Sequence, residues 1–169
     1  NLVDRVSHVI VDTFGNEVMA ATEIALDRPE MLNVAALSGG GYVVGWMDGS
    51  VLTLRRFDNA GVAQGVPLSF TDGVTQSDEE LLSLTGTSDG GFAVAYGVVD
   101  TVPLKRIRRF NAAGATNGAP IDVDLGTADV SPGDPAYLVP LPNGGLFLLY
   151  VAYRVDDAIE AVFIDAAGN

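Results

Sequence analysis

The chain has 169 residues, of which 48% are hydrophobic and 18% charged, with 20 glycines, 8 prolines and no cysteine. This composition excludes a disordered chain, and the length suffices for one domain with a buried core. The formal net charge of -13 disfavours nucleic acid and anionic membrane surfaces as partners, and the lack of cysteine excludes disulfides and thiolate metal sites.

Two segments recur along the chain in phase. The first is a seven-residue segment that reads VIVDTFG at 9–15, RRFDNAG at 55–61, RRFNAAG at 108–114 and VFIDAAG at 162–168, so that its final glycines are 46, 53 and 54 residues apart. The second reads GGGYVVGW at 39–46, DGGFAVAY at 89–96 and NGGLFLLY at 143–150. Such a period indicates stacked supersecondary units. We therefore expect a single repeat domain over 1–169, with units at about 1–28, 29–77, 78–133 and 134–169.

Each unit is predicted to be a four-stranded antiparallel meander. The chain opens with two strands, at about 3–12 and 17–26, that correspond to the third and fourth strands of a unit. The next unit reads MLNVAAL, YVVGWM, VLTLRRF and VAQGVPLSF, separated by SGGG, DGS and DNAG. These runs are too short for helices, and the glycine-containing connectors supply the positive φ that hairpins need. A second complete unit follows, and the chain ends with three strands of another.

Side-chain alternation on the second strands predicts how the meanders stack. Tyr42, Val44 and Trp46 share one bulky face, and the opposite face carries Val43 and Gly45. The next unit has Phe92, Val94 and Tyr96 on one face and two alanines on the other. Small residues let a neighbouring sheet approach closely, so we expect sheets that are covered on both faces.

Prolines on the fourth strands favour one architecture over another. Pro67 and Pro120 occupy equivalent places, and because proline cannot donate to a ladder, the fourth strand is predicted to be an outer edge. An edge that recurs once per unit is typical of a β-propeller-like fold, and the alternative is a β-trefoil. Three units do not close a propeller, so either two copies form one ring or the chain is an arc of a larger ring or assembly. A homo-oligomer is therefore an expected partner.

The repeated segments DGGFAVAY and RRFNAAG resemble a repeat of very large secreted bacterial proteins of the RTX, or hemolysin-type calcium-binding, class and of related adhesins. The resemblance covers nearly all of the chain and implies a propeller-like scaffold in a secreted, extracellular bacterial protein. The calcium-binding nonapeptide of that class is absent, because SGGGYVVGW has no carboxylate where an ion would need one. We therefore expect no cofactor, and calcium stays open without a motif.

Five residues are candidates for ligand binding. Trp46, Tyr96 and Tyr150 are aligned at the ends of their second strands and could stack on a carbohydrate, although the same alternation places them on the buried face. Arg55 and Arg108 are equivalent on third strands and could hold an acidic ligand, or they could pair with nearby carboxylates.

No catalytic signature occurs in the sequence. His8 is the only histidine, and its neighbour Ser7 points to the other face of a strand, which makes a catalytic pair geometrically poor. Acidic clusters lie at 78–80, 122–124 and 156–157 and could serve a hydrolase. Three functions stay open: a non-catalytic extracellular scaffold or binding module, a glycan-acting hydrolase or lyase with loop carboxylates, and a structural repeat that assembles by exchange of a strand between copies.

Overall fold

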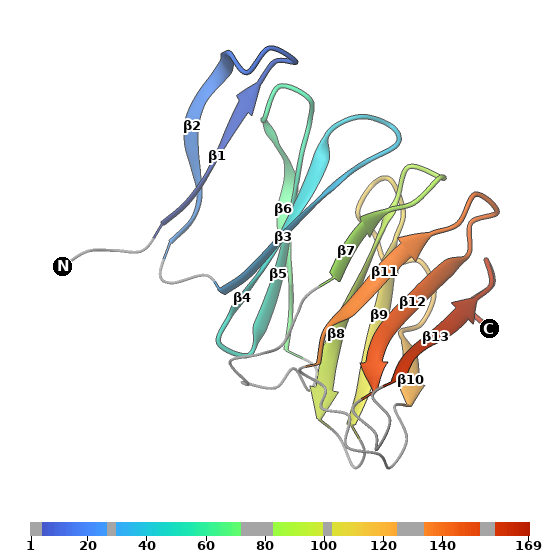
Figure 1. Cartoon of the computed structure of the whole chain (residues 1–169). Helices are drawn as coiled ribbons and strands as arrows, with labels where there is room; N and C mark the ends of the chain where they lie inside the picture. Colours follow the sequence, from blue (N-terminus) through green and yellow to red (C-terminus); the bar gives the residue numbers. More distant parts are fainter. Residues whose placement is uncertain (1–4, 27–29, 72–82, 100–102, 125–133, 153–157) are drawn as a thin grey trace.

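The computed structural model describes residues 5–26, 30–71, 83–99, 103–124, 134–152 and 158–169. This part of the chain contains thirteen strands and no helix, so the predicted all-β class is confirmed. The strands form four separate antiparallel sheets that stand face to face in a row (Figure 1). It follows that no helix long and apolar enough to cross a membrane occurs in the described ranges.

Two complete meanders lie in the middle of the chain, as the repeat predicts. The first consists of β3 (Glu30–Ala36), β4 (Tyr42–Asp48), β5 (Val51–Phe57) and β6 (Ala63–Phe70). The second consists of β7 (Ser83–Gly86), β8 (Phe92–Val99), β9 (Pro103–Phe110) and β10 (Ile121–Asp124). Each sheet has its strands in sequence order, so each strand pairs with its neighbours in the chain.

The sheets at the two ends of the row have fewer strands. The N-terminal hairpin pairs β1 (Arg5–Val11) with β2 (Glu17–Leu26). The C-terminal sheet contains β11 (Ala136–Pro140), β12 (Leu146–Ala152) and β13 (Ala158–Ile164). β1 and β13 both carry the third-strand segment, so the hairpin has the outer half of a unit and the C-terminal sheet has the first three strands of one.

The seven-residue segment recurs because it encodes one kind of turn. In the turn after β5, the Oδ1 atom of Asp58 accepts hydrogen bonds of 2.9 Å from the backbone N–H groups of Ala60 and Val62. Asn111 does the same for Ala113 and Ala115 in the turn after β9. The final glycine of the segment has positive φ, +77° at Gly61 and +84° at Gly114, which other residues adopt only with strain. The acidic or amide residue and the glycine together close the hairpin.

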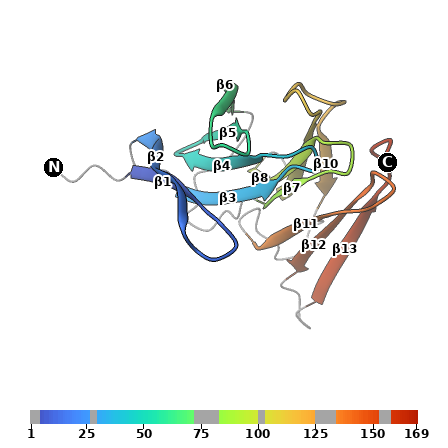
Figure 2. The same cartoon turned by 90° about the horizontal axis from the view of Figure 1, so that it is seen from above.

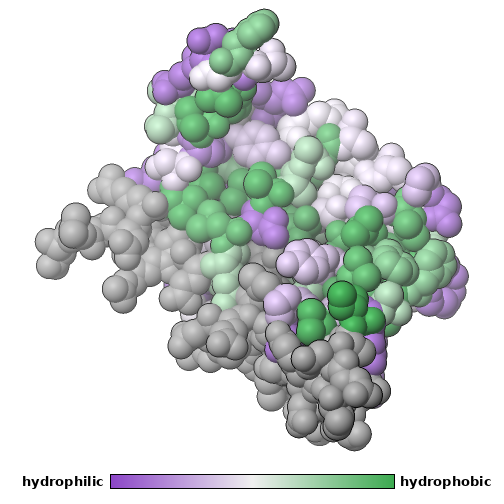
Figure 3. Space-filling model, viewed as in Figure 1, coloured by the Kyte–Doolittle hydropathy of each residue, from purple (hydrophilic) through white to green (hydrophobic). Residues whose placement is uncertain are grey.

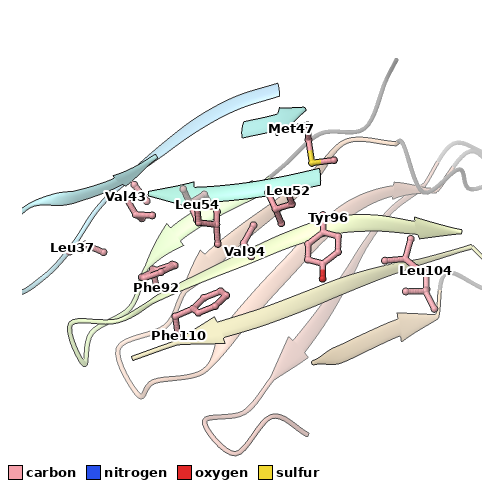
Figure 4. Close-up of a cluster of buried hydrophobic side chains, with 13 residues drawn as sticks. Leu37, Val43, Met47, Leu52, Leu54, Phe92, Val94, Tyr96, Leu104 and Phe110 are labelled. Carbon is pink, nitrogen blue, oxygen red and sulfur yellow. The ribbon is translucent and has the colours of Figure 1, made fainter. Parts of the chain in front are cut away.

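The two middle sheets pack through the alternation that the sequence predicted. Val43 of β4 and Leu52 and Leu54 of β5 point toward Phe92 and Val94 of β8, and all five are buried (Figure 4). The rings of Phe92 and Phe110 stack with centroids 4.7 Å apart in this cluster.

On the other side of β8, Ala93 and Ala95 lie against Leu146 and Leu148 of β12, and all four are buried. The bulky face of each second strand therefore covers the smaller face of the sheet before it, which confirms sheets covered on both faces in the middle of the row.

The first strands of successive sheets lie beside one another. β7 contacts both β3 and β11, and the sheets spread from this side so that β6 and β10 point away (Figure 2). The approach is close at Gly86, where an added Cβ atom would overlap the backbone oxygen of Ala36. β6 and β10 are each the last strand of their sheet, which confirms the predicted outer edge. Pro67 lies in β6 where the pairing with β5 shifts register, whereas Pro120 directly precedes β10.

Candidate binding groove

A groove of about 590 Å³ lies between the N-terminal hairpin and the sheet β3–β6. Side chains of β3 and β4, including Leu32, Val34 and Val44, form its apolar floor. Side chains of β1, including Ile10, form its wall. The groove exists because the hairpin covers β4 and β5 of the next sheet and leaves β3 open. Ile24 of the hairpin packs with the buried Trp46 and Phe57, whereas Leu32 and Val34 of β3 are 48% and 62% exposed.

His8 and Tyr42 are the polar groups of interest in this groove. The Oη atom of Tyr42 lies 2.8 Å from Nδ1 of His8, and the imidazole packs edge-on against Phe57 with centroids 4.6 Å apart. The Nε2 atom of His8 is buried and has no hydrogen-bond partner among the described residues. Burial, and then the positive charge of Arg55, lower the pKa of His8, so the imidazole is neutral at pH 7.

The three candidate aromatic residues do not form one platform. Trp46, Tyr96 and Tyr150 are 8%, 2% and 5% exposed, and each belongs to a different buried cluster. The hydroxyl of Tyr96 accepts a hydrogen bond of 2.8 Å from Nε of Arg108, and the hydroxyl of Tyr150 donates one of 2.7 Å to Glu160. Their burial favours the packing role over stacking on a carbohydrate.

The two candidate arginines also make contacts within the protein. The guanidinium of Arg108 lies over the ring of Phe70 at 4.7 Å from the centroid and so links β9 to the sheet before it. Arg55 lies beside Phe57 at 5.8 Å, and its Nε atom is buried without a hydrogen-bond partner in the described ranges. The structure brings Arg55 near His8 and the groove, and it does not bring Arg55 and Arg108 together.

Other basic residues of the third strands act as links between and within sheets. Arg109 donates hydrogen bonds of 2.8 and 2.7 Å to the backbone oxygens of Ala166 and Gly144 in the turns of the next sheet. Arg106 makes two hydrogen bonds with Asp122 on the adjacent strand.

Lys105, which the sequence did not single out from its neighbours, is fully buried and donates to the backbone oxygen of Asp134 at 2.7 Å. The basic side chains of β9, which include the candidate Arg108, thus bind the protein itself.

The acidic clusters are only partly described. Asp122 pairs with Arg106, while residues 78–80 and 156–157 lie outside the described residues. Within the described ranges, no group of three or more histidine, aspartate or glutamate side chains could hold a metal ion. The groove itself was missed at the level of sequence, because alternation shows which face of a strand is apolar and not whether another sheet covers it.

The fold and the groove thus define an all-β repeat protein with an apolar, partly open side. No protein-family model matches the chain, and a search of the curated proteins finds no match.

Proposed function

We propose that the chain is a non-catalytic, propeller-like repeat module that serves as an extracellular scaffold or binding surface. The observation that carries the proposal is the radial arrangement of the sheets, with β3, β7 and β11 side by side and β6 and β10 at the outer edges. A β-trefoil would instead join strands of successive units in one barrel, whereas here each meander forms its own sheet. The resemblance to repeats of secreted bacterial proteins supports the extracellular location.

The polar groups of the described residues support binding rather than catalysis. Tyr96 and Tyr150 make hydrogen bonds within their own sheets, and Arg109 donates to a turn of the next sheet. Asp122 is neutralised by Arg106. Rigid strands that present variable connections form a binding surface in many folds. Two of the longer connections between strands, 97–103 and 124–135, include residues outside the described ranges.

The test is a panel of bacterial surface polysaccharides, measured both for binding and for cleavage. We expect at least one polysaccharide to raise the melting temperature of the chain without release of reducing ends. A Tyr96→Phe variant is the matched control, because it removes a buried hydroxyl and should keep binding at the surface. Release of reducing ends by the wild-type chain, lost on substitution of a loop carboxylate, would overturn the proposal in favour of a glycan-acting enzyme.

A second candidate function, self-assembly by exchange of a strand, is favoured by one observation. The C-terminal sheet has three strands where the middle sheets have four, so β13 presents an unpaired edge in the described part of the chain. An edge strand of this kind can accept a strand from another molecule.

A further inference from the structure

A pocket of one kind recurs between successive sheets, at their outer strands. One pocket, of about 240 Å³, lies between β5 and β6 of one sheet and the turn after β9 of the next. Another, of about 280 Å³, lies between β9, the segment that leads into β10 and the turn after β13. In both, the wall of the first sheet carries an arginine, Arg56 or Arg109, and the opposite wall is the turn of the recurring seven-residue segment.

The pocket at Arg56 lies inside the row. Its walls belong to the sheets β3–β6 and β7–β10, which each have four strands. Apolar residues also reach the surface on the side drawn in Figure 3, over the region of β3 and over the C-terminal sheet. A further sheet on either side of the row would cover those faces, whereas the pocket at Arg56 is bounded by two complete meanders.

Arg56 and Arg109 hold the same place in the recurring segment, as do Ile10 and Phe163, but the two arginines differ in their contacts. Arg109 donates to backbone oxygens in two turns of the next sheet, which fix its guanidinium. Arg56 is half-buried, and its Nε atom is buried without a hydrogen-bond partner. Within the described ranges, Arg56 makes no hydrogen bond and no ion pair. Its donors therefore stay available to a ligand.

The carboxylates of the chain leave Arg56 unneutralised. Asp58, two residues along the chain, accepts hydrogen bonds from two N–H groups of its own turn and from the side-chain amide of Gln64. No acidic side chain of the described residues lines the pocket, although the chain has 22 acidic residues and 9 basic ones. A buried donor without an acceptor costs free energy, and a bound acceptor recovers it.

The rest of the pocket is small and largely apolar. It is lined by the buried Leu54, by Leu68 and by Val66, which is 81% exposed. The guanidinium lies at the wall beside Gly114, where an added Cβ atom would lie 3.3 Å from Nη1 of Arg56. A volume of about 240 Å³ is below the roughly 300–1,000 Å³ of sites for drug-sized ligands. The pocket therefore fits one charged group on a body no larger than a sugar ring.

We propose that this pocket binds the carboxylate of a small organic acid or sugar acid through the guanidinium of Arg56. The planar fork of an arginine matches the two oxygens of a carboxylate. Phosphate sites instead use several basic side chains or backbone N–H groups. Here one arginine lines the pocket, and the N–H groups of Ala113 and Ala115 are bonded to Asn111. The net charge of -13 also opposes a doubly charged anion more than a singly charged one.

This inference deepens the proposed function, because it gives the binding module a site and a ligand class. A dissolved organic acid and a uronic acid residue of a polysaccharide present the same carboxylate to Arg56. The inference rests on the proposed function only in the second case, since the pocket and its arginine are the same in both.

The first test is isothermal titration calorimetry with D-glucuronate and, as the neutral counterpart, methyl glucoside. We expect the wild type to bind glucuronate and not the glucoside. Arg56→Gln should weaken the binding of glucuronate about tenfold or more, because it removes charge-assisted hydrogen bonds. Arg55→Gln is the matched control, since it removes the same charge from the neighbouring residue, which points to the other face of β5. This control should bind glucuronate like the wild type.

The second test supplies the missing carboxylate from the protein. Val66→Glu places an acidic side chain at an exposed position of the same pocket, where it can pair with Arg56. It should abolish the binding of glucuronate, whereas Val66→Gln, which lacks the charge, should bind like the wild type. Urea unfolding checks the fold, and we expect wild-type midpoints for both Val66 variants and for Arg56→Gln, because none of them removes a hydrogen bond of the described residues.

Three results would overturn the inference. The first is a wild type that binds no glucuronate. The second is an Arg55→Gln variant that loses as much affinity as Arg56→Gln, since the effect is then one of overall charge. The third is tighter binding of inorganic phosphate than of glucuronate, which contradicts a carboxylate site.

Polygalacturonate identifies the source of the acid. Binding of this polysaccharide that is lost in Arg56→Gln supports the site and assigns it to a glycan. Binding of glucuronate without polygalacturonate supports the site for a dissolved acid. A neutral polysaccharide that binds the wild type and Arg56→Gln equally supports the proposed function at another surface, so failure of the site and failure of that function remain distinguishable.

Discussion

The sheet faces inside the row and the faces at its two open sides are built from the same repeated unit and differ in what covers them. Leu84 and Leu138 are buried where Val34 is exposed, and Arg109 reaches into the turns of the next sheet where the equivalent Phe163 is 54% exposed. Gly114 lies against Arg56 of the sheet before it, whereas Gly15, in the equivalent turn of the hairpin, has no described atom near its Cβ position. The comparison shows that the position of a sheet in the row, and not its local sequence, decides which of its residues stabilise the fold.

The largest expected difference is between Leu84→Ala and Val34→Ala. Leu84→Ala removes a buried side chain between two sheets and should lower the free energy of unfolding by about 2–5 kcal/mol. Val34→Ala should cost less than about 1 kcal/mol in the monomer, because exposed apolar groups gain little on folding. Urea denaturation at a protein concentration that keeps the chain monomeric measures both. Equal losses would show that the groove is already filled in the isolated chain.

A smaller difference is expected between Arg109→Ala and Phe163→Ala. Arg109→Ala removes two hydrogen bonds to the oxygens of Ala166 and Gly144 and should cost about 1–3 kcal/mol. Phe163→Ala should change the stability of the monomer by about 0.5 kcal/mol or less, since its ring is largely in solvent. Thermal and urea unfolding of the two variants test the comparison. It fails if Phe163→Ala is the more destabilising of the two.

Alanine substitutions at the turn glycines Gly15 and Gly114 should lower the free energy of unfolding by amounts that differ by about 1 kcal/mol. Alanine at Gly15 or Gly114 must adopt a φ of +85° or +84°, and this strain costs roughly 1–2 kcal/mol in both turns. At Gly114 the added Cβ atom would also lie 3.2 Å from the Cδ atom of Arg56, so Gly114→Ala should lose about 1 kcal/mol more than Gly15→Ala. The midpoints of urea unfolding measure this excess. Its absence would mean that Arg56 moves away without cost.

The smallest expected effect is the pH dependence that His8 contributes at the groove. Because burial and Arg55 lower the pKa of His8 in the folded state, the unfolded chain binds a proton at a higher pH than the folded chain. Stability should therefore decrease as the pH falls from 7 through the ordinary histidine value and toward the lower folded value. His8→Gln should remove the decrease between about pH 7 and 5, since the chain has no other histidine. A decrease of the same size in His8→Gln would assign it to carboxylates instead.

Much of the fold could be predicted from the sequence because its signals are local. The meanders, their turns and the outer edge strands follow from alternation, from segments such as RRFDNAG and from Pro67. In the first complete unit, residue 39 is glycine where Asp89 and Asn143 cap the equivalent turns. Instead, Oδ1 of Asn59 in the adjacent turn accepts a hydrogen bond of 2.6 Å from the backbone N–H of Gly41. The pattern of one segment does not reveal this compensation, because Asn59 and Gly41 meet only in the folded sheet.

The candidate site shows where sequence reasoning ends. The sequence by itself determined that Trp46, Tyr96 and Tyr150 lie on a buried face, since neighbouring side chains of a strand point in opposite directions. Only the tertiary structure decided that Arg108 packs on Phe70, that Lys105 is fully buried, and that Val34 is exposed while Leu84 is not. Periodicity fixes which face of a strand is apolar, but burial depends on whether another sheet stands opposite, and that is a property of the whole row.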